Sequence, residues 1–110
     1  MSETDDDLKG TALNLSELVA YQDGSVVSRT LIDKPTGTVS LFSFDAGQGL
    51  SEHTAPFDAM VSIVDGEAEV SVGGEPHNVK HGEMIIMPAN VPHALRAHQR
   101  FKMMLVMVRK

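Results

Sequence analysis

Two stretches of the sequence decide the fold: Gly47–Gly66, which reads GQGLSEHTAPFDAMVSIVDG, and Gly82–Ala97, which reads GEMIIMPANVPHALRA. Each begins with a glycine and contains one histidine between short apolar runs. Asp65-Gly66 ends the first stretch and is typical of a two-residue β-hairpin turn. Pro56 cannot donate a hydrogen bond to a β-ladder, so it bends or ends the strand before it. Both stretches therefore predict short strands joined by tight turns.

The same alternation of short strands and turns continues through most of the chain. Glycine and proline separate runs rich in apolar and β-branched residues at even spacing, which favours a β-barrel or a β-sandwich. Asn14-Leu-Ser-Glu17 has the pattern of a helix capping box and predicts a short helix through about Tyr21. The expected strands cover residues 26–32, 39–44, 50–55, 59–64, 68–72, 84–87, 93–97 and 101–109.

The two stretches resemble the paired motifs of the cupin superfamily, and their spacing fits every fixed position of both motifs. The resemblance implies an all-β fold, the cupin-type double-stranded β-helix or RmlC-like jelly-roll barrel, over residues 37–109, preceded by a short N-terminal helix and strand. The matching residues are Gly47, His53 and Gly66 in the first motif and Gly82, Pro88 and His93 in the second.

The chain departs from the family pattern at four positions. Ala55 stands where the first motif has its second histidine, and Ala59 stands where it has a glutamate. Asn90 replaces a glycine of the second motif, and Ala97 replaces its asparagine. Asparagine tolerates positive φ better than other side chains except glycine, so Asn90 is consistent with a turn. Two of the four metal ligands that the resemblance implies are therefore missing.

The remaining ligand positions predict a pocket with two histidines. Side chains two residues apart on a strand share a face, so position 55 faces the same way as His53, and in this fold that face is the barrel interior. His93 is expected opposite His53. The predicted pocket is lined by His53, Ala55, Ala59, His93 and Leu95.

Two histidines alone make an incomplete site for zinc, nickel, iron or manganese, because catalytic sites of these metals normally use three protein ligands. Asp58, one residue before the expected glutamate, is a candidate third ligand, and a substrate carboxylate or water could take the same place. In the alternative without metal, the histidines hydrogen-bond or exchange protons with a small ligand. In the structural alternative they are interior residues retained from a metal-binding ancestor.

These alternatives give three functional hypotheses. The first is a small-molecule-binding barrel with a weak or incomplete divalent-metal site. The second is a metal-dependent enzyme of the dioxygenase, isomerase or epimerase type, which completes its metal shell with Asp58, water or substrate. The third is a structural or partner-binding domain, which explains neither His53 nor His93. Fold-level analogy does not choose among them.

Composition limits the location, the domain organisation and the partners that we expect for the protein. The chain has 110 residues, no cysteine and a net charge of −6, which favour one cytoplasmic domain and oppose nucleic-acid binding. We expect residues 1–12 to form an acidic disordered tail and residues 13–110 to form the domain. The longest apolar run, Met103–Val108, is too short to cross a membrane. That run and Met84–Met87 are apolar on both faces, so an outer cover is needed, either from the N-terminal helix and strand or from a second subunit, and we expect a homodimer.

Overall fold

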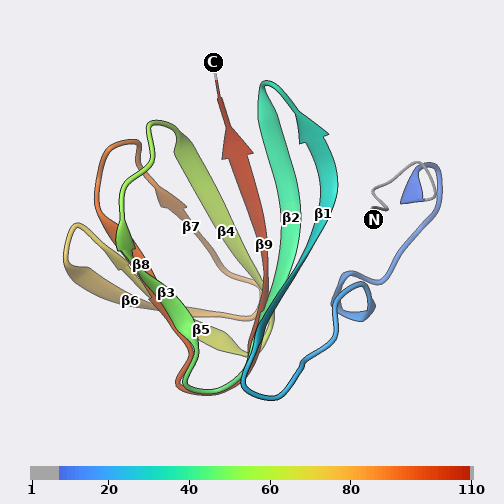
Figure 1. The fold of residues 1–110 in the computed structure, drawn as a ribbon, viewed down its shortest axis with the longest axis horizontal. Helices are drawn as coiled ribbons and strands as arrows, with labels where there is room; N and C mark the ends of the chain where they lie inside the picture. Colours follow the sequence, from blue (N-terminus) through green and yellow to red (C-terminus); the bar gives the residue numbers. More distant parts are fainter. Residues whose placement is uncertain (1–7, 110) are drawn as a thin grey trace.

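The computed structural model describes residues 8–109 and consists of two antiparallel sheets that face each other (Figure 1). The five-stranded sheet has the order β1-β2-β9-β4-β7, and the four-stranded sheet has the order β3-β8-β5-β6. This arrangement confirms the predicted all-β jelly roll. The strands are β1 Val26–Lys34, β2 Gly37–Phe44, β3 Gly49–His53, β4 Asp58–Asp65, β5 Glu67–Val72, β6 Glu75–Lys80, β7 Met84–Met87, β8 His93–Arg96 and β9 Phe101–Val108.

The predicted N-terminal helix is wrong, and the predicted N-terminal strand is confirmed as β1. Only one turn of 3-10 helix, η2 Leu15–Glu17, forms where a helix to about Tyr21 was expected. Asn14 does cap this turn, because its side chain accepts a hydrogen bond from the backbone N–H of Ser16. The expected tail falls partly on residues 1–7, which lie outside the described residues. No helix within residues 8–109 has the length and apolar character that crossing a membrane requires.

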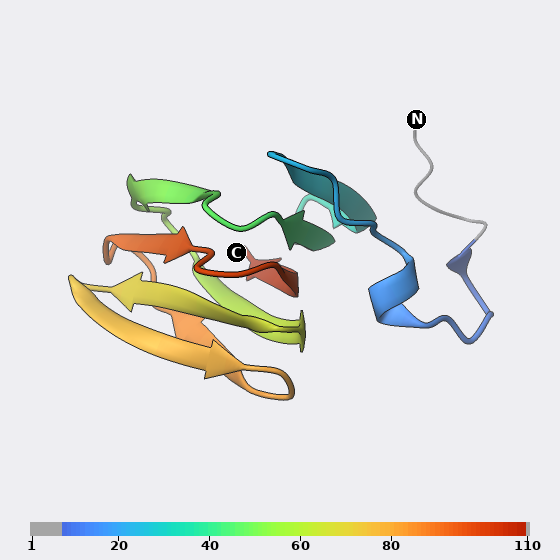
Figure 2. The ribbon, with the colours of Figure 1, turned by 90° about the horizontal axis from the view of Figure 1, so that it is seen from below.

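Side chains of the sheet explain why the chain does not continue as a helix. Arg29 donates to the carbonyl of Leu18 at 3.1 Å, and Ser43 donates to the carbonyl of Ala20 at 2.7 Å. Lys102 donates to the carbonyl of Ser16. A longer helix would use such carbonyls internally, so tertiary contacts replace helical hydrogen bonds. The segment instead runs along the outside of the five-stranded sheet, beside β1 and β2 (Figure 2).

Hydrogen bonds of Tyr21 and Arg100 hold this segment against the turns at one end of the two sheets. The Tyr21 hydroxyl donates to Asp65 at 2.5 Å, and burial together with this hydrogen bond raises the pKa of Tyr21 above its usual range. Arg100 donates to Asp45 at 2.8 Å and to Asp23 at 2.6 Å. The hydrogen bond from Arg100 lowers the pKa of Asp45 to about 2. These contacts hold residues 21–25 against the loop that precedes β9.

The core fills one end of the space between the sheets. Phe44 and Phe101 are cross-strand partners whose stacked rings have centroids 4.5 Å apart, and both are fully buried. Burial falls along β9, because Met103 is fully buried whereas Leu105 and Met107 are only partly buried. The barrel is therefore closed at the Phe101 end of β9 and opens toward the Met107 end, where the candidate site lies.

The turns use the conformations that the sequence predicts. Gly66 has φ +75, and a Cβ added there would lie 2.4 Å from the carbonyl oxygen of Arg100, so both the turn and the close approach require glycine. Asn90 has φ 64 and is the only described non-glycine residue with positive φ. The predicted role of Asn90 as a turn residue is confirmed.

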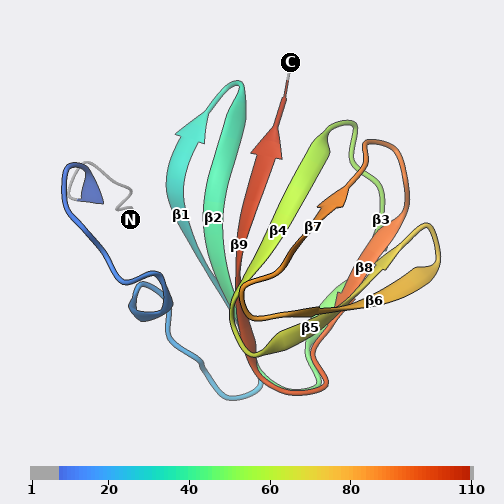
Figure 3. The ribbon, with the colours of Figure 1, turned by 180° about the vertical axis from the view of Figure 1, so that it is seen from behind.

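The outer face of the five-stranded sheet is only partly covered. β1 extends the edge of this sheet, next to β2, instead of crossing its outer face (Figure 3). The N-terminal segment covers part of this face, where Leu41 is fully buried. No segment within residues 8–109 covers β7, the Met107 end of β9 or the end of β1 near Ile32. Their exposed apolar side chains are Ile32, Met84, Ile86 and Val108.

Candidate functional site

The two predicted histidines meet between neighbouring strands. His53 ends β3 and His93 begins β8, and the two are cross-strand partners in the antiparallel pair. A register shift between Leu50 and His53 lets both side chains reach the same face. Their ring centroids are 4.4 Å apart and the rings are inclined at 70°. His93 is buried and His53 is more exposed, so the pair has one solvent-facing member.

The backbone orients both imidazoles in the same way. Nδ1 of His53 lies 2.7 Å from the carbonyl oxygen of Ser51, and Nδ1 of His93 lies 3.1 Å from that of Val91. A carbonyl oxygen can only accept, so each neutral ring carries its proton on Nδ1. No residue in 8–109 hydrogen-bonds either Nε2 atom. Each Nε2 therefore keeps a lone pair for a hydrogen-bond donor or a metal ion.

The histidine pair forms the polar part of a small cavity between the sheets. The cavity has a volume of about 60 Å³, and its wall is apolar apart from the two imidazoles. An apolar site with a few placed polar groups is the usual composition of a small-molecule pocket. The lining residues are Leu50, His53, Ala55, Phe57, Ala59, Met87, His93, Leu95, Met103, Leu105 and Met107.

The structure brings most of the predicted site residues together. His53, His93, Ala55, Ala59 and Leu95 all line the cavity. The small Ala55 and Ala59 side chains leave space where the family motif places ligands. The other lining residues were not predicted from the sequence: Leu50, Phe57, Met87 and the β9 residues Met103, Leu105 and Met107. Alternation along residues 101–109 is the signal that could have placed the β9 side chains, because Met103, Leu105 and Met107 share one face.

Asp58 does not join the histidines. Its register partner is Val108, whereas that of Ala59 is Met107, so Asp58 occupies the outer face of β4 and Ala59 the inner face. The Asp58 carboxylate accepts a hydrogen bond from the backbone N–H of Ala89 at 2.9 Å, and the residue is exposed. This contact ties the β4 entry to the loop that follows β7.

The residues at the cavity do not fit a complete transition-metal site. The cavity supplies two imidazole nitrogens and no carboxylate or thiolate. Within residues 8–109 no cluster of three or more histidine, cysteine, aspartate or glutamate side chains could hold a metal ion. Catalytic zinc sites use three protein ligands, and non-haem iron sites add a carboxylate to two histidines. The pair is therefore best described as two hydrogen-bonding groups in an apolar cavity.

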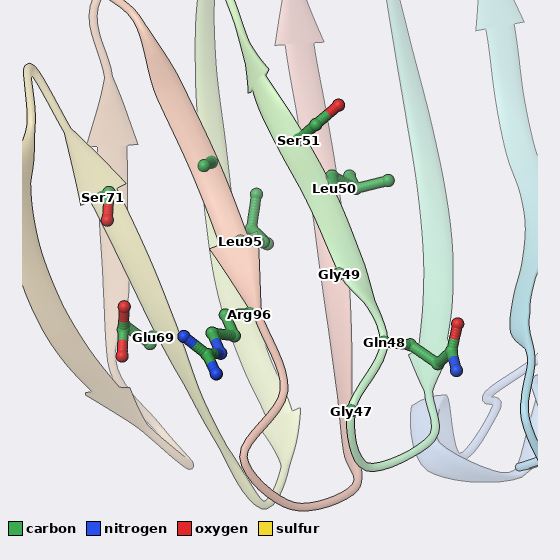
Figure 4. A pocket seen from close by; sticks show the side chains of 10 residues that line it. Gly47, Gln48, Gly49, Leu50, Ser51, Glu69, Ser71, Leu95 and Arg96 are labelled. Carbon is green, nitrogen blue, oxygen red and sulfur yellow. The ribbon is translucent and has the colours of Figure 1, made fainter.

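A second, shallower depression lies on the outer face of the four-stranded sheet, over β3, β8 and β5 (Figure 4). Its volume is about 300 Å³. Glu69, Ser71 and Arg96 lie along it, and Glu69 accepts a hydrogen bond from His98 at 2.6 Å. These side chains are partly or fully exposed, and glycines 47 and 49 form part of its rim. This depression brings together no buried polar groups, so the interior cavity is the stronger candidate.

Two facing antiparallel sheets with a histidine pair between them define a small jelly-roll barrel protein. Residues 40–109 match the cupin domain family, and the chain therefore belongs to the cupins. The comparison with curated proteins gave no match.

Solved structures agree with this assignment over the whole chain. SPY1581, a conserved protein of unknown function from Streptococcus pyogenes, is 37% identical, with a TM-score of 0.91 over 100% of this chain and 96% of that chain. A cupin 2 conserved barrel domain protein from Leptotrichia buccalis is 44% identical, with a TM-score of 0.86 over 88% of this chain and 47% of that chain. A cupin superfamily protein from Desulfitobacterium hafniense is 26% identical, with a TM-score of 0.87 over 93% and 94% of the two chains.

Proposed function

We propose that this cupin binds a small molecule in the cavity between its sheets, with His53 and His93 as the polar contacts. The observation that carries the proposal is the composition of the cavity: two imidazoles with free Nε2 atoms inside an otherwise apolar wall. Each Nε2 lacks a partner among the described residues, so the two nitrogens favour a ligand that supplies hydrogen-bond donors. The apolar wall favours a compact hydrocarbon body next to those polar groups.

The chemistry of the pair limits what such a ligand does there. Neutral imidazoles with Nδ1–H fixed on backbone carbonyls accept at Nε2, so a hydroxyl, amide or protonated acid group of the ligand can donate to them. A histidine can also take up that proton, which makes proton exchange with the ligand available to the same site. Neither role needs a metal ion.

A ligand screen with a chelator tests the proposal. Compounds that enter the cavity should raise the midpoint of thermal unfolding equally with and without EDTA. The same compounds should lose their effect on His53→Ala and His93→Ala. His77→Ala is the matched control, because His77 is exposed on β6 and does not line this cavity. Stabilisation that disappears with EDTA, or that survives both variants, would contradict the proposal.

The second candidate is a metal-dependent enzyme of the dioxygenase, isomerase or epimerase type. The free Nε2 atoms favour it, because metal-binding histidines commonly place the other ring nitrogen on a backbone carbonyl. Water or substrate would have to complete the shell, or Asp58 would have to leave Ala89 and reach the inner face. Elemental mass spectrometry on untagged protein tests this candidate. About one zinc, nickel, iron or manganese ion per chain, lost in His53→Ala, would support it.

We also propose a location and an oligomeric state for the protein. The net charge of −6 and the absence of cysteine support a cytoplasmic protein without a nucleic-acid partner. The uncovered apolar face of the five-stranded sheet supports a homodimer.

A further inference from the structure

We infer that the ligand of the cavity is a short carboxylic acid whose carboxylate is bound by Arg109 at the mouth. The inference rests on the proposed function, since it names the chemical class of the small molecule that the same cavity takes. It depends on where Arg109 lies, on the absence of a protein partner for its charge, and on the size of the cavity.

The chain brings Arg109 next to a residue of the cavity wall. Arg109 follows directly after β9, and its N–H donates to the carbonyl of Thr36 at 2.7 Å, which fixes the chain there. Its guanidinium carbon lies 5.2 Å from the centre of the Phe57 ring. Phe57 lines the cavity, and so does Met107, two residues before Arg109. A guanidinium stacked on a wall residue is held close to the mouth and loses little freedom on binding.

The charge of Arg109 has no carboxylate partner in the described part of the chain. Arg100 differs, because it pairs with both Asp23 and Asp45. The carboxylate nearest to Arg109 in the register, that of Asp58, lies on the outer face and accepts from Ala89. Arginine binds carboxylates through two parallel hydrogen bonds, so a partly buried guanidinium without an anion is suited to an anionic ligand.

A second polar atom lies at the same end of the sheet. The hydroxyl of Thr38 is buried and has no hydrogen-bond partner in the described structure. Thr38 is the β2 register partner of Met107, so it belongs to the inner face of the five-stranded sheet. Buried hydroxyls normally have a partner. A ligand carboxylate held by Arg109, directly or through a water molecule, would supply an acceptor for this hydroxyl.

The cavity volume sets the size of the ligand. A cavity needs a volume of about 10–15 Å³ to hold one water molecule. The cavity of about 60 Å³ therefore holds about four to six heavy atoms. With the carboxylate outside at Arg109, the buried part is a short chain whose carbons contact the apolar wall and whose hydroxyl donates to Nε2 of His53 or His93. The structure thus favours short aliphatic hydroxy acids over sugars or nucleotides.

3-Hydroxybutanoate and its neutral isostere 3-hydroxybutanamide make a matched pair of probes, because both keep the hydroxyl that donates to the histidines. Binding is followed by NMR of the histidine ring signals at neutral pH, because shifts of His53 and His93 place the probe in this cavity. We expect 3-hydroxybutanoate to bind about tenfold or more tightly than 3-hydroxybutanamide, since a charge-assisted pair replaces a neutral one. Arg109→Gln should remove that preference. Arg96→Gln is the control, because Arg96 lies on the outer face of the four-stranded sheet (Figure 4).

The outcomes separate this inference from the function beneath it. Equal binding of the two probes, or a preference for 3-hydroxybutanoate that survives Arg109→Gln, would overturn the carboxylate inference and leave the binding pocket standing. If neither probe shifts the signals of His53 and His93, the inference is overturned. If a neutral fragment mixture also leaves both signals unchanged, the proposed function fails with it. The midpoint of thermal unfolding of Arg109→Gln confirms that the variant is folded.

Discussion

His53 and His93 are cross-strand partners with ring centroids 4.4 Å apart, and each holds its Nδ1 against the carbonyl two residues before it. The two strands thus present the same nitrogen, Nε2, without a partner. The pair forms the polar part of an otherwise apolar cavity.

The two histidines should differ in their contribution to stability. His93 is only 4% exposed and packs in the interior, so His93→Ala should cost about 1–3 kcal/mol of unfolding free energy through lost packing and a lost hydrogen bond. His53 is exposed, and His53→Ala should cost less than about 1 kcal/mol. Urea unfolding measures both values, with His77→Ala as the control. Equal losses of unfolding free energy in the two variants would contradict the difference in burial between His93 and His53.

Gly66 should be far less tolerant of alanine than Gly74. Both have positive φ, but only at Gly66 does an added Cβ meet the backbone, 2.4 Å from the carbonyl oxygen of Arg100. Gly74→Ala should cost about 1 kcal/mol from φ alone, and Gly66→Ala should cost more than about 2 kcal/mol because the β9 entry must also move. Thermal or urea unfolding of the two variants checks the order. The reverse order would contradict the close approach at the Asp65-Gly66 turn.

Asp45 should add to stability above the acid range and lose that contribution as the pH falls. The hydrogen bond from Arg100 lowers its pKa in the folded protein to about 2, from an ordinary value of 3.8. A carboxyl group with a lowered pKa stabilises the fold above its unfolded pKa, and protonation removes this effect between pH 3.8 and about 2. The thermal midpoints of the wild type and Asp45→Asn should therefore converge across that window. A difference that stays constant down to pH 2 would show that Arg100 does not act on this carboxylate.

The uncovered face of the five-stranded sheet should hold two copies of the chain together. Met84 and Ile86 are 47% and 56% exposed on this face, and Val108, on the same face two strands away, is 62% exposed. A lysine at position 86 would place a charge in that contact, so Ile86→Lys should sediment as a monomer while the wild type sediments as a dimer. His77→Lys on the opposite sheet should leave the dimer intact. Wild type that is monomeric at micromolar concentration would contradict the dimer.

Much of the fold was predictable because the signals are local. Turn residues such as Asp65-Gly66 and Asn90 fix the strand ends, and two-residue alternation places Ala59 and Leu95 on inner faces. The failure at Leu15–Glu17 has a tertiary cause, because Arg29, Ser43 and Lys102 bind carbonyls that a helix would use itself. These contacts join residues that are distant in the sequence, so no local sequence pattern indicates them.

The site was predictable only in part for a similar reason. Motif spacing predicted that His53 and His93 would face each other, and the structure brings them together. The stacking of Arg109 on Phe57 joins the end of β9 to the loop before β4, and no pattern within either segment indicates it. The outward position of Asp58 depends on its register with Val108, which sequence alone does not fix.

The most direct test of the account is an NMR titration of metal-free protein with a mixture of small organic fragments in the presence of EDTA, read on the histidine ring signals. We expect at least one fragment to shift the signals of His53 and His93 and to leave those of His77 and His81, both exposed, unchanged. Signals that stay fixed in EDTA but respond to the same fragments after one equivalent of metal is added would contradict it, and would assign the pair to a metal centre.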